Sequence, residues 1–276
     1  MISINTNYGG LYSAKAAQQS QSSVDQAMER LSTGKRINYA KDDAAGQAIA
    51  TRLTAEIQGL AMASRNAADG QSMLDTADGA LAETHNLLLR MRELAVQAAN
   101  GTLQSTDRTA INAEFSALES EITRISDNTS WAGIKLLDSS LSGGVTFHVG
   151  SGASQTITHS IPEMAASAAT MGIVAAVAIT DVTKANSAIG QLDVAIAGVS
   201  KQRAEIGAVS NRLDATVSNL NQVKVNLSSS KGRIEDADFA QETSNLAKNQ
   251  ILQQAATAML AQANSSQSTV LTLLRG

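Results

Sequence analysis

The residues of this chain that could do chemistry are two clusters of charged side chains and three scattered histidines. One cluster is Lys41, Asp42 and Asp43, and the other lies within 233–238, which holds one arginine and three acidic residues. Carboxylates act as general acids or bases where a pocket and an apolar environment shift their pKa. The sequence indicates neither feature here, so we interpret both clusters as helix-end charges and intersubunit ion pairs.

The three histidines, His85, His148 and His159, do not form a metal-binding pattern. His148 and His159 could face each other across a predicted hairpin, but two ligands do not make a zinc site. The chain has no cysteine, and it contains no HExxH, Walker A, GxGxxG or GxSxG motif. The sequence therefore predicts a protein that is not an enzyme and that holds no cofactor and no metal.

Composition narrows the class of protein further. The 276 residues carry a net charge of −4 with no basic run, which argues against nucleic acid and membranes as partners. Aromatic residues make up only 3%, so the core must consist of Ala, Leu, Ile and Val, as in thin helical bundles. The N-terminus lacks the pattern of a cleavable secretory signal, and the most apolar window, 164–179, is too short to span a bilayer.

A single proline, Pro162, separates two stretches that can each run as long helices. Within 189–227, apolar residues recur at steps of three and four, which predicts a helix roughly 60 Å long with one apolar side. The N-terminal half supplies partner helices at 44–100 and 105–128, the second capped by Ser105 or Thr106. Alternating residues at 145–149 and 156–161, around a glycine-containing turn, predict a β-hairpin.

Each end of the chain is a weakly apolar segment next to a glycine. Residues 1–33 precede Gly34, and a last helix at about 234–263 follows Gly232, where we expect the preceding helix to break. Such segments bury too little surface alone to offset their ordering entropy, so we predict arms (1–43 and 233–276) that are disordered in the free monomer. Two glycines inside the helix at 44–100, Gly70 and Gly79, predict close helix approach.

The predicted fold is mainly α. The N- and C-terminal halves form a long antiparallel helical rod or coiled coil, and a small β-hairpin at about 145–161 lies near the middle. The helical domain is expected to cover 44–232. These patterns by themselves indicate an elongated helical protein that oligomerises.

Two blocks of the sequence resemble the two ends of bacterial flagellin. The first is 31–50 (LSTGKRINYAKDDAAGQAIA), and the second is 233–256 (RIEDADFAQETSNLAKNQILQQAA). Shorter matches occur at 1–7, 90–99, 260–264 and 270–275. The resemblance covers 1–160 and about 182–276, and the two long blocks occur in the correct order.

The resemblance implies a structural subunit of the bacterial flagellar filament, the propeller for swimming motility. Such a subunit is secreted by the flagellar type III apparatus with an uncleaved N-terminus, and it polymerises under a cap. In the family the arms pair as an inner coiled coil, which places 1–43 and 233–276 innermost and 44–232 outside. The hairpin resembles the one implicated in switching between supercoil forms. The large outer domains of the family are absent, since only about 139–188 separates the matching halves.

The resemblance also implies partners. They are the chain itself, in a homopolymer or a filament mixed with other flagellins, the flagellar cap and hook-junction proteins, and an export chaperone for 233–276. Arg90, Leu94 and Glu114 match the pattern that an animal Toll-like receptor binds in many flagellins. Some flagellins carry O-linked sugars on exposed hydroxyls, and the candidates here are Ser139, Ser140, Ser142, Ser151 and Ser154.

Burial of apolar arm residues is the predicted assembly mechanism, with the C-terminal arm packing against the N-terminal arm. The predicted filament-core interface is Leu11, Val24, Met28, Leu31, Ile251, Leu252, Met259 and Leu260. Two alternatives remain. A hook–filament junction protein shares such ends, although 233–264 looks more like a filament subunit. A helical signalling or binding module would need a membrane anchor or a ligand pocket, and the sequence shows neither.

Overall fold

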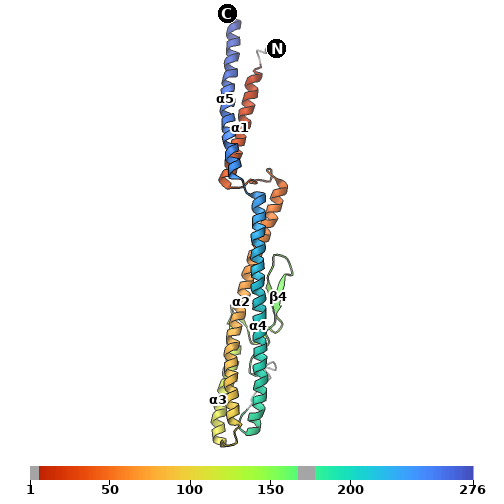
Figure 1. Cartoon of the computed structure of the whole chain (residues 1–276), viewed down its shortest axis with the longest axis vertical. Coiled ribbons are helices and arrows are strands. Elements are labelled where there is room, and N and C mark those ends of the chain that lie inside the picture. The colour runs from red at the N-terminus through yellow and green to blue at the C-terminus, as the bar shows by residue number, and fades with distance from the viewer. Residues whose placement is uncertain (1–5, 167–177, 276) are drawn as a thin grey trace. The chain divides into compact units, whose positions relative to one another are not determined.

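The computed structural model describes residues 6–166 and 178–275, and the chain divides into two units (Figure 1). We call residues 1–55 with 226–276 the arm unit, and residues 56–225 the central unit. The divisions fall inside two long helices, α2 (Ala44–Ala98) and α4 (Val182–Glu235), and not at the glycines that separate the predicted arms. Each unit is described separately below.

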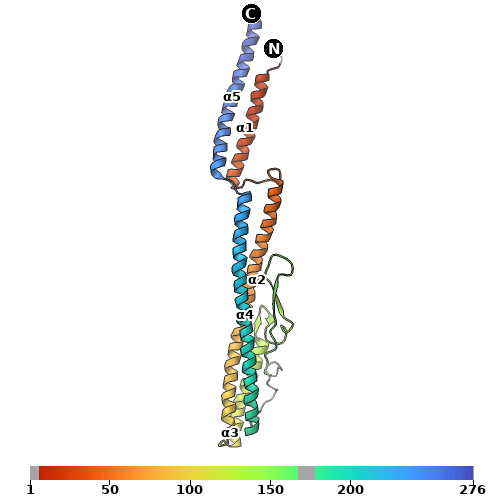
Figure 2. The same ribbon diagram turned by 45° about the vertical axis from the view of Figure 1, so that its right-hand side comes forward.

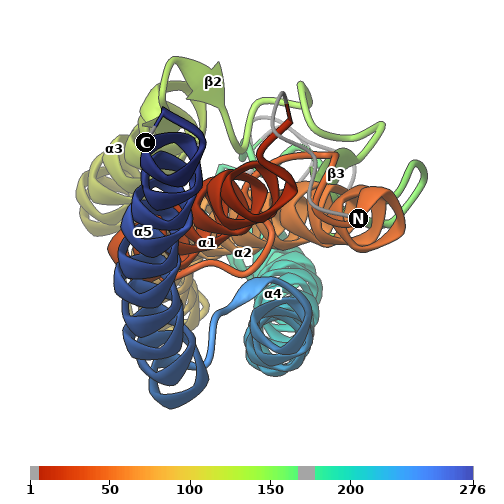
Figure 3. The ribbon, with the colours of Figure 1, turned by 90° about the horizontal axis from the view of Figure 1, so that it is seen from above.

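The arm unit pairs α1 (Tyr8–Thr33) with α5 (Phe239–Arg275), which lie side by side and antiparallel (Figures 2 and 3). Helix α1 begins after Asn7, whose Oδ1 accepts a hydrogen bond from the Gly10 amide at 2.9 Å. It ends at Gly34, which has a left-handed φ of 71°, so the predicted stop is confirmed. Asp238 accepts from the Ala240 amide at 2.9 Å and thereby caps the start of α5.

The predicted helix break at Gly232 is wrong, because α4 continues through this glycine to Glu235. A β-carbon on Gly232 would lie 2.7 Å from an Asp236 carboxylate oxygen, so the absence of a side chain at this glycine leaves room for the Asp236 carboxylate. Lys231 and Glu235 form an ion pair at 3.4 Å across this turn of the helix. The helix ends where Asp236 forms a β-bridge with Lys35, a contact that local sequence patterns do not reveal.

The central unit is built around α2, α4 and α3 (Ser105–Asn128), which share one apolar core. Helices α2 and α4 run antiparallel, since Arg203 pairs with Asp78 at 2.8 Å and Arg92 pairs with Asp193 at 2.6 Å. We call the core that α2, α3 and α4 share the central seam. Its largest fully buried side chains on α2 and α3 are Leu74, Leu81, Leu88, Met91, Leu94, Phe115 and Ile122.

The bounds of α3 agree with the prediction, but its cap does not. Gln104 is the N-cap residue, and its backbone amide donates to the Asp107 carboxylate at 3.1 Å in a capping box. Ser105 and Thr106 therefore do not cap the helix. The reciprocal contact with Asp107 decides the first residue of α3.

The predicted β-hairpin is confirmed as β3 (Val145–His148) and β4 (Thr156–His159), which pair antiparallel. The ring of Phe147 packs so close to α2 that a β-carbon on Gly70 would lie 2.7 Å from it. Gly70 thus marks a close approach of the hairpin and not of a helix. Among the described residues, no side chain and no other element lies within 4 Å of a β-carbon built on Gly79, so the prediction for that glycine is wrong.

A second, shorter ladder was not predicted. It joins β1 (Ser130–Trp131) to β2 (Ile134–Lys135) through Ala132 and Gly133, whose φ values of 47° and 86° form the turn. The predicted class, mainly α with a small β-hairpin near the middle, is confirmed. Most of the apolar window 164–179 lies outside the described residues. Among the helices that are described, none has both the length and the apolar character of a membrane span.

Candidate assembly surface

The contact between α1 and α5, which we call the arm seam, is made mainly by small and polar side chains. Its buried residues are Gly10, Ser13, Ser20, Val24 and Ala27 of α1, with Glu242 and Ala256 of α5. Small residues let two helix backbones approach closely, but they remove little apolar surface from water. The arm seam therefore contributes little hydrophobic stabilisation within one chain.

Polar contacts set the register of the arm seam. Arg30 pairs with the buried carboxylate of Glu242 at 3.0 Å near one end, and the Asn7 amide donates to Asn264 at 3.2 Å near the other. Between them, the Gln253 amide donates to Gln21. Such contacts orient the two helices with a modest net gain in stability.

Large apolar side chains of the same two helices remain exposed. Their exposed fractions lie between 45% and 78%. We call this set the arm apolar surface: Tyr8, Leu11, Tyr12 and Met28 of α1, and Phe239, Ile251, Leu252 and Met259 of α5. A pocket of about 420 Å³, lined in part by Tyr12, Gln19 and Leu252, opens on it. Exposed apolar sets of this kind typically mark sites of protein–protein contact.

The eight residues predicted for the filament-core interface divide by burial. Val24 is buried, and Leu31 and Leu260 are half-buried. The other five, Leu11, Met28, Ile251, Leu252 and Met259, are exposed in the single chain. The reason is that Gly, Ser and Ala occupy the positions that face the arm seam. Their role in contacts between chains stays a prediction. The sequence analysis missed Tyr8, Tyr12 and Phe239, although the first two are spaced i, i+4 on one helix side.

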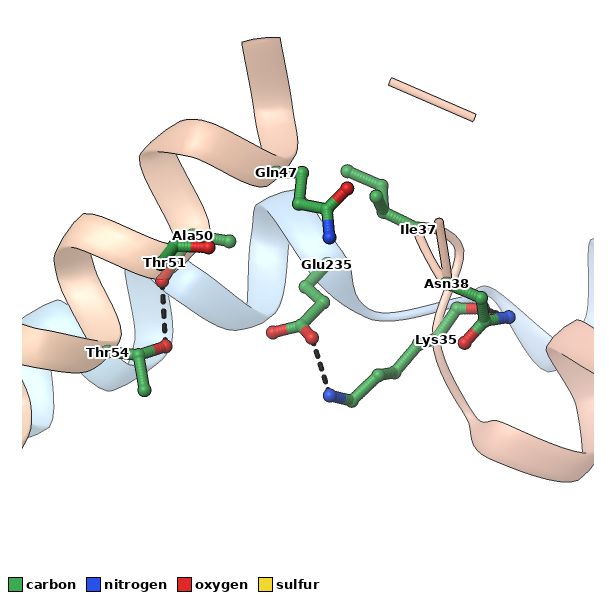
Figure 4. Close-up of a pocket in the computed structure, with 8 residues that line it drawn as sticks. All are labelled: Lys35, Ile37, Asn38, Gln47, Ala50, Thr51, Thr54 and Glu235. Atoms are coloured by element: carbon green, nitrogen blue, oxygen red, sulfur yellow. Dashed lines mark hydrogen bonds and ion pairs between the residues drawn. The ribbon is translucent and has the colours of Figure 1, made fainter. Parts of the chain in front are cut away.

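The charged cluster at 233–238 holds the connector 34–38 in place, as Figure 4 shows. Lys35 Nζ lies 2.5 Å from a carboxylate oxygen of Glu235, and the Arg36 amide donates to the Glu235 carbonyl at 2.6 Å. The hydrogen bond from Lys35 lowers the pKa of Glu235, which is thereby kept ionised. This carboxylate lines a pocket of about 230 Å³. It is suited to an ion pair and not to proton donation.

The second charged cluster also has structural contacts. Asp42 accepts from the Tyr39 amide at 3.0 Å, a contact that lowers the pKa of this carboxyl group. Asp43 accepts from the Gly46 amide at 2.8 Å at the start of α2, and Lys41 lies over the Tyr39 ring at 5.0 Å. The cluster at 233–238 therefore forms an ion pair within the chain, whereas Asp42 and Asp43 accept backbone amides next to the start of α2. Ion pairs between subunits stay a prediction.

The histidines of the hairpin do not face each other. His148 is paired with Thr156 and His159 with Val145, because the turn that joins the strands is shorter than facing histidines would require. His159 is buried, and its Nε2 lies 3.2 Å from the side-chain nitrogen of Gln202 on α4. Burial lowers the pKa of His159. Within 6–166 and 178–275, no three potential metal ligands come together.

The residues that resemble a receptor site differ in their accessibility. Arg90 and Glu114 form an exposed ion pair at 2.8 Å between α2 and α3. Leu94 is 2% exposed and belongs to the core of the central unit. The expectation that Leu94 contacts a receptor is therefore corrected, since it presents almost no surface. The roles of Arg90 and Glu114 stay predictions.

The candidate glycosylation sites all lie at the surface. The five serines are exposed: Ser139, Ser140, Ser142, Ser151 and Ser154. Ser139 and Ser154 have φ values of 77° and 68°, as residues in tight turns often do. An enzyme could reach these hydroxyls, and whether they carry sugars stays a prediction.

Comparisons with known proteins match an N-terminal and a C-terminal stretch of the chain. A model of the bacterial flagellin N-terminal helical region matches residues 4–142, and a model of the C-terminal helical region matches 189–274. The chain is 46% identical over 249 residues to a flagellin of Halalkalibacterium halodurans, which spans 90% of this chain and 91% of that protein. The chain belongs to the bacterial flagellin family. It is thus a structural subunit of the flagellar filament and not an enzyme, as the sequence predicted.

Two further similarities support this membership. The flagellar filament 33 kDa core protein of Treponema phagedenis is 40% identical to the chain, with 99% of both proteins covered. The crystal structure of Bacillus cereus flagellin matches 56% of this chain and 88% of that one, with a TM-score of 0.51 and 32% identity. Family membership favours the filament subunit over the hook–filament junction protein and the signalling module.

Proposed function

We propose that the arm unit supplies the inner contacts of the filament, and that the arm apolar surface is buried between copies of the chain. One observation carries this proposal. The arm seam is filled by small residues, while eight large apolar side chains on the same helices are left 45–78% exposed. Covering them would gain roughly 25 cal/mol per Å² of apolar area, before entropy is subtracted.

The small size of the buried residues in the arm seam also supports the prediction that the arms are disordered in the free subunit. An arm seam of glycine, serine and alanine holds α1 and α5 together weakly, so we expect the arms to be disordered before assembly. Disordered arms suit export through a narrow channel, and we propose secretion to the outside of the cell followed by folding at the filament tip. Hydrogen exchange on the monomer would test this: amides of 8–33 and 239–269 should exchange far faster than those of the central seam.

Polymerisation of an Ile251→Asp variant tests the assembly role. A carboxylate at this exposed position leaves the central unit folded but would be desolvated in a filament, so we expect no filaments. The matched control is Gln254→Asp, which adds the same charge to the exposed face of the same helix without removing an apolar side chain. Electron microscopy after salting out should show filaments for the wild type and this control, because such salts favour apolar burial. Normal filaments from Ile251→Asp would refute the proposal.

A truncation sharpens the same test. Because α4 runs to Glu235 and Asp236 bridges Lys35, a chain ending at Ala237 keeps the connector and removes only α5. We expect this chain to stay folded by circular dichroism and to form no filaments, even with preformed seeds. Polymers from it would show that α5 is dispensable for assembly.

We also propose specific partner proteins, on the basis of family membership. They are the flagellar cap, the hook-junction proteins, an export chaperone for 233–276 and other flagellins in a mixed filament. Export at full rate from cells that lack a chaperone would count against that partner. For O-linked sugars at the five serines, an intact mass of native filaments equal to the sequence mass would exclude modification.

Recognition by an animal Toll-like receptor is favoured by one specific feature, the exposed pair of Arg90 and Glu114. A receptor that binds this surface would lose affinity when both charges are removed. We expect reduced signalling from an Arg90→Ala, Glu114→Ala double variant supplied as monomer. Undiminished signalling would contradict the proposal, and the exposed pair Arg124 and Glu121 on α3 provides a control double variant.

A further inference from the structure

The methionines of the described residues fall into two groups by exposure. Met73, Met91 and Met164 belong to the core of the central unit and are at most 4% exposed. The other three are open to solvent: Met28 is 55% exposed, Met62 is 51% exposed and Met259 is 60% exposed. A thioether sulfur that solvent can reach is open to two-electron oxidants, whereas a buried one is shielded. A mild oxidant should therefore select the second group.

Two of the exposed methionines lie on the arm apolar surface. Met28 is on α1, and Met259 is on α5, two helical turns after Leu252 and thus on the same side of that helix. Met62 differs in its position. It lies on α2 in the central unit, where its Sδ is 3.9 Å from an Arg65 guanidinium nitrogen. Met62 therefore offers an internal control, an exposed methionine outside the arm apolar surface.

We propose that Met28 and Met259 are oxidation sites through which peroxides block the addition of the subunit to a filament. The proposal rests on the assembly role proposed above for the arm apolar surface. The Sδ lone pair attacks one oxygen of hydrogen peroxide, so that an S–O bond forms as the O–O bond breaks. The departing hydroxide takes the proton of the transferred hydroxyl and becomes water. Sulfur is oxidised by two electrons to the sulfoxide, and the peroxide is reduced.

The consequence depends on where the sulfoxide forms. Oxidation turns a flexible apolar side chain into a polar one, which is costly at a position that must be desolvated. At Met28 and Met259 the sulfoxide would weaken contacts between chains, whereas at Met62 it would change an exposed side chain of the central unit. The sites are open in the free subunit and covered in the polymer. Oxidation of Met28 and Met259 should therefore be faster in monomers than in filaments.

The experiment treats monomers with dilute hydrogen peroxide and then measures seeded polymerisation. Peptide mass spectrometry assigns the added oxygen atoms to individual methionines. We expect sulfoxide at Met28, Met62 and Met259 before the buried methionines, and a rise of roughly tenfold or more in the critical concentration. A Met28→Leu, Met259→Leu double variant should polymerise equally well before and after treatment, because leucine has similar volume and no sulfur. Met62→Leu should give no protection.

Recovery by methionine sulfoxide reductases provides a second readout on the wild-type chain. Reduction of both sulfoxide epimers should restore the original critical concentration. The proposal is overturned if oxidised wild type polymerises normally with Met28 and Met259 converted, or if reduction restores the thioethers without restoring assembly. It is also overturned if Met62→Leu protects as well as the double variant. Failure of the assembly role itself shows separately, as normal filaments from untreated Ile251→Asp.

Discussion

The arm seam and the central seam are both contacts between antiparallel helices, but they bury different side chains. The central seam encloses fully buried leucines such as Leu81 and Leu88, together with Phe115 of α3. The arm seam encloses glycine, serine and alanine, with Val24 as its largest buried apolar side chain on α1. Full burial of a leucine or phenylalanine contributes about 1.5–3 kcal/mol, and smaller side chains contribute less. Helical periodicity alone therefore does not tell whether a pair of helices is stable within one chain.

Polar contacts do not account for this difference. The central seam has exposed ion pairs, including Arg203 with Asp78 and Arg92 with Asp193. The arm seam has Arg30 with Glu242, which is less exposed. Exposed pairs of this kind contribute about 0–1 kcal/mol each, so they fix register more than stability. The contrast between the two seams lies in their apolar side chains.

The largest expected difference is between two leucine-to-alanine variants, one in each unit, in their free energy of unfolding. Leu88→Ala leaves a cavity in the central seam, where Leu88 is 0% exposed, and should lower the free energy of unfolding by about 2–5 kcal/mol. Leu252→Ala removes an exposed side chain and should change the same quantity by less than about 0.5 kcal/mol. Urea denaturation followed by circular dichroism measures both.

In a polymerisation assay, we expect Leu252→Ala to have the larger effect and Leu88→Ala the smaller one. Leu252→Ala should raise the critical concentration, because its side chain is proposed to be buried between chains. Leu88→Ala, assayed at a temperature where it is still folded, should polymerise nearly normally. Equal effects of the two substitutions on unfolding would mean that Leu252 packs within the single chain as closely as Leu88, against its exposure.

The elements that the sequence predicted well have strong local signals. The start of α2 at Ala44, both bounds of α3 and the hairpin follow from apolar period, turn residues and alternation. Gly34 also ends α1 as expected, because a left-handed residue at that position needs no partner elsewhere in the chain.

The missed features depend on residues far apart in the sequence. Gly232 lies inside α4, and the helix ends only where Asp236 forms a β-bridge with Lys35, about two hundred residues away in the sequence. The covered side of α1 depends on its register against α5, and that register brings small residues together. Leu94 lies within a block that resembles a receptor site, yet its side chain belongs to the core. Periodicity shows which residues share a helix side, but not which side is covered.

Two glycines of α2 offer a sharper test of how tightly the central unit is packed. Gly70→Ala places a β-carbon 2.7 Å from the Phe147 ring and should destabilise the unit by about 1–3 kcal/mol. Gly79→Ala meets no side chain or other element of the described residues within 4 Å and should stabilise the unit by up to about 1 kcal/mol, since alanine favours helix. Opposite shifts of the urea midpoint at equal m-value are the expected result. Destabilisation by both would show that the two sites are equally crowded.

The smallest expected effect is a dependence of the central unit on pH through His159. Burial holds its pKa below the ordinary value of 6.5, while the nearby charge of Glu205 opposes this shift only in part. The Gln202 side-chain nitrogen is 3.2 Å from His159 Nε2 and 3.4 Å from the Ser160 carbonyl. As a donor to both, it requires a neutral ring that accepts at Nε2. A protonated ring would present a second donor to this amide.

The sign of the effect follows from the direction of the shift. A folded-state pKa below the unfolded one means that the contribution of His159 to stability is present above about pH 6.5 and is lost as the pH falls through the folded pKa. Urea midpoints should therefore drop between pH 7.5 and 5.5, and a His159→Gln variant should show a smaller drop. His148→Gln, at an exposed position of the same hairpin, should keep the full wild-type drop. An equal drop in all three proteins would assign the pH dependence to groups other than His159, and the hairpin contact with α4 would then be insensitive to the charge of His159.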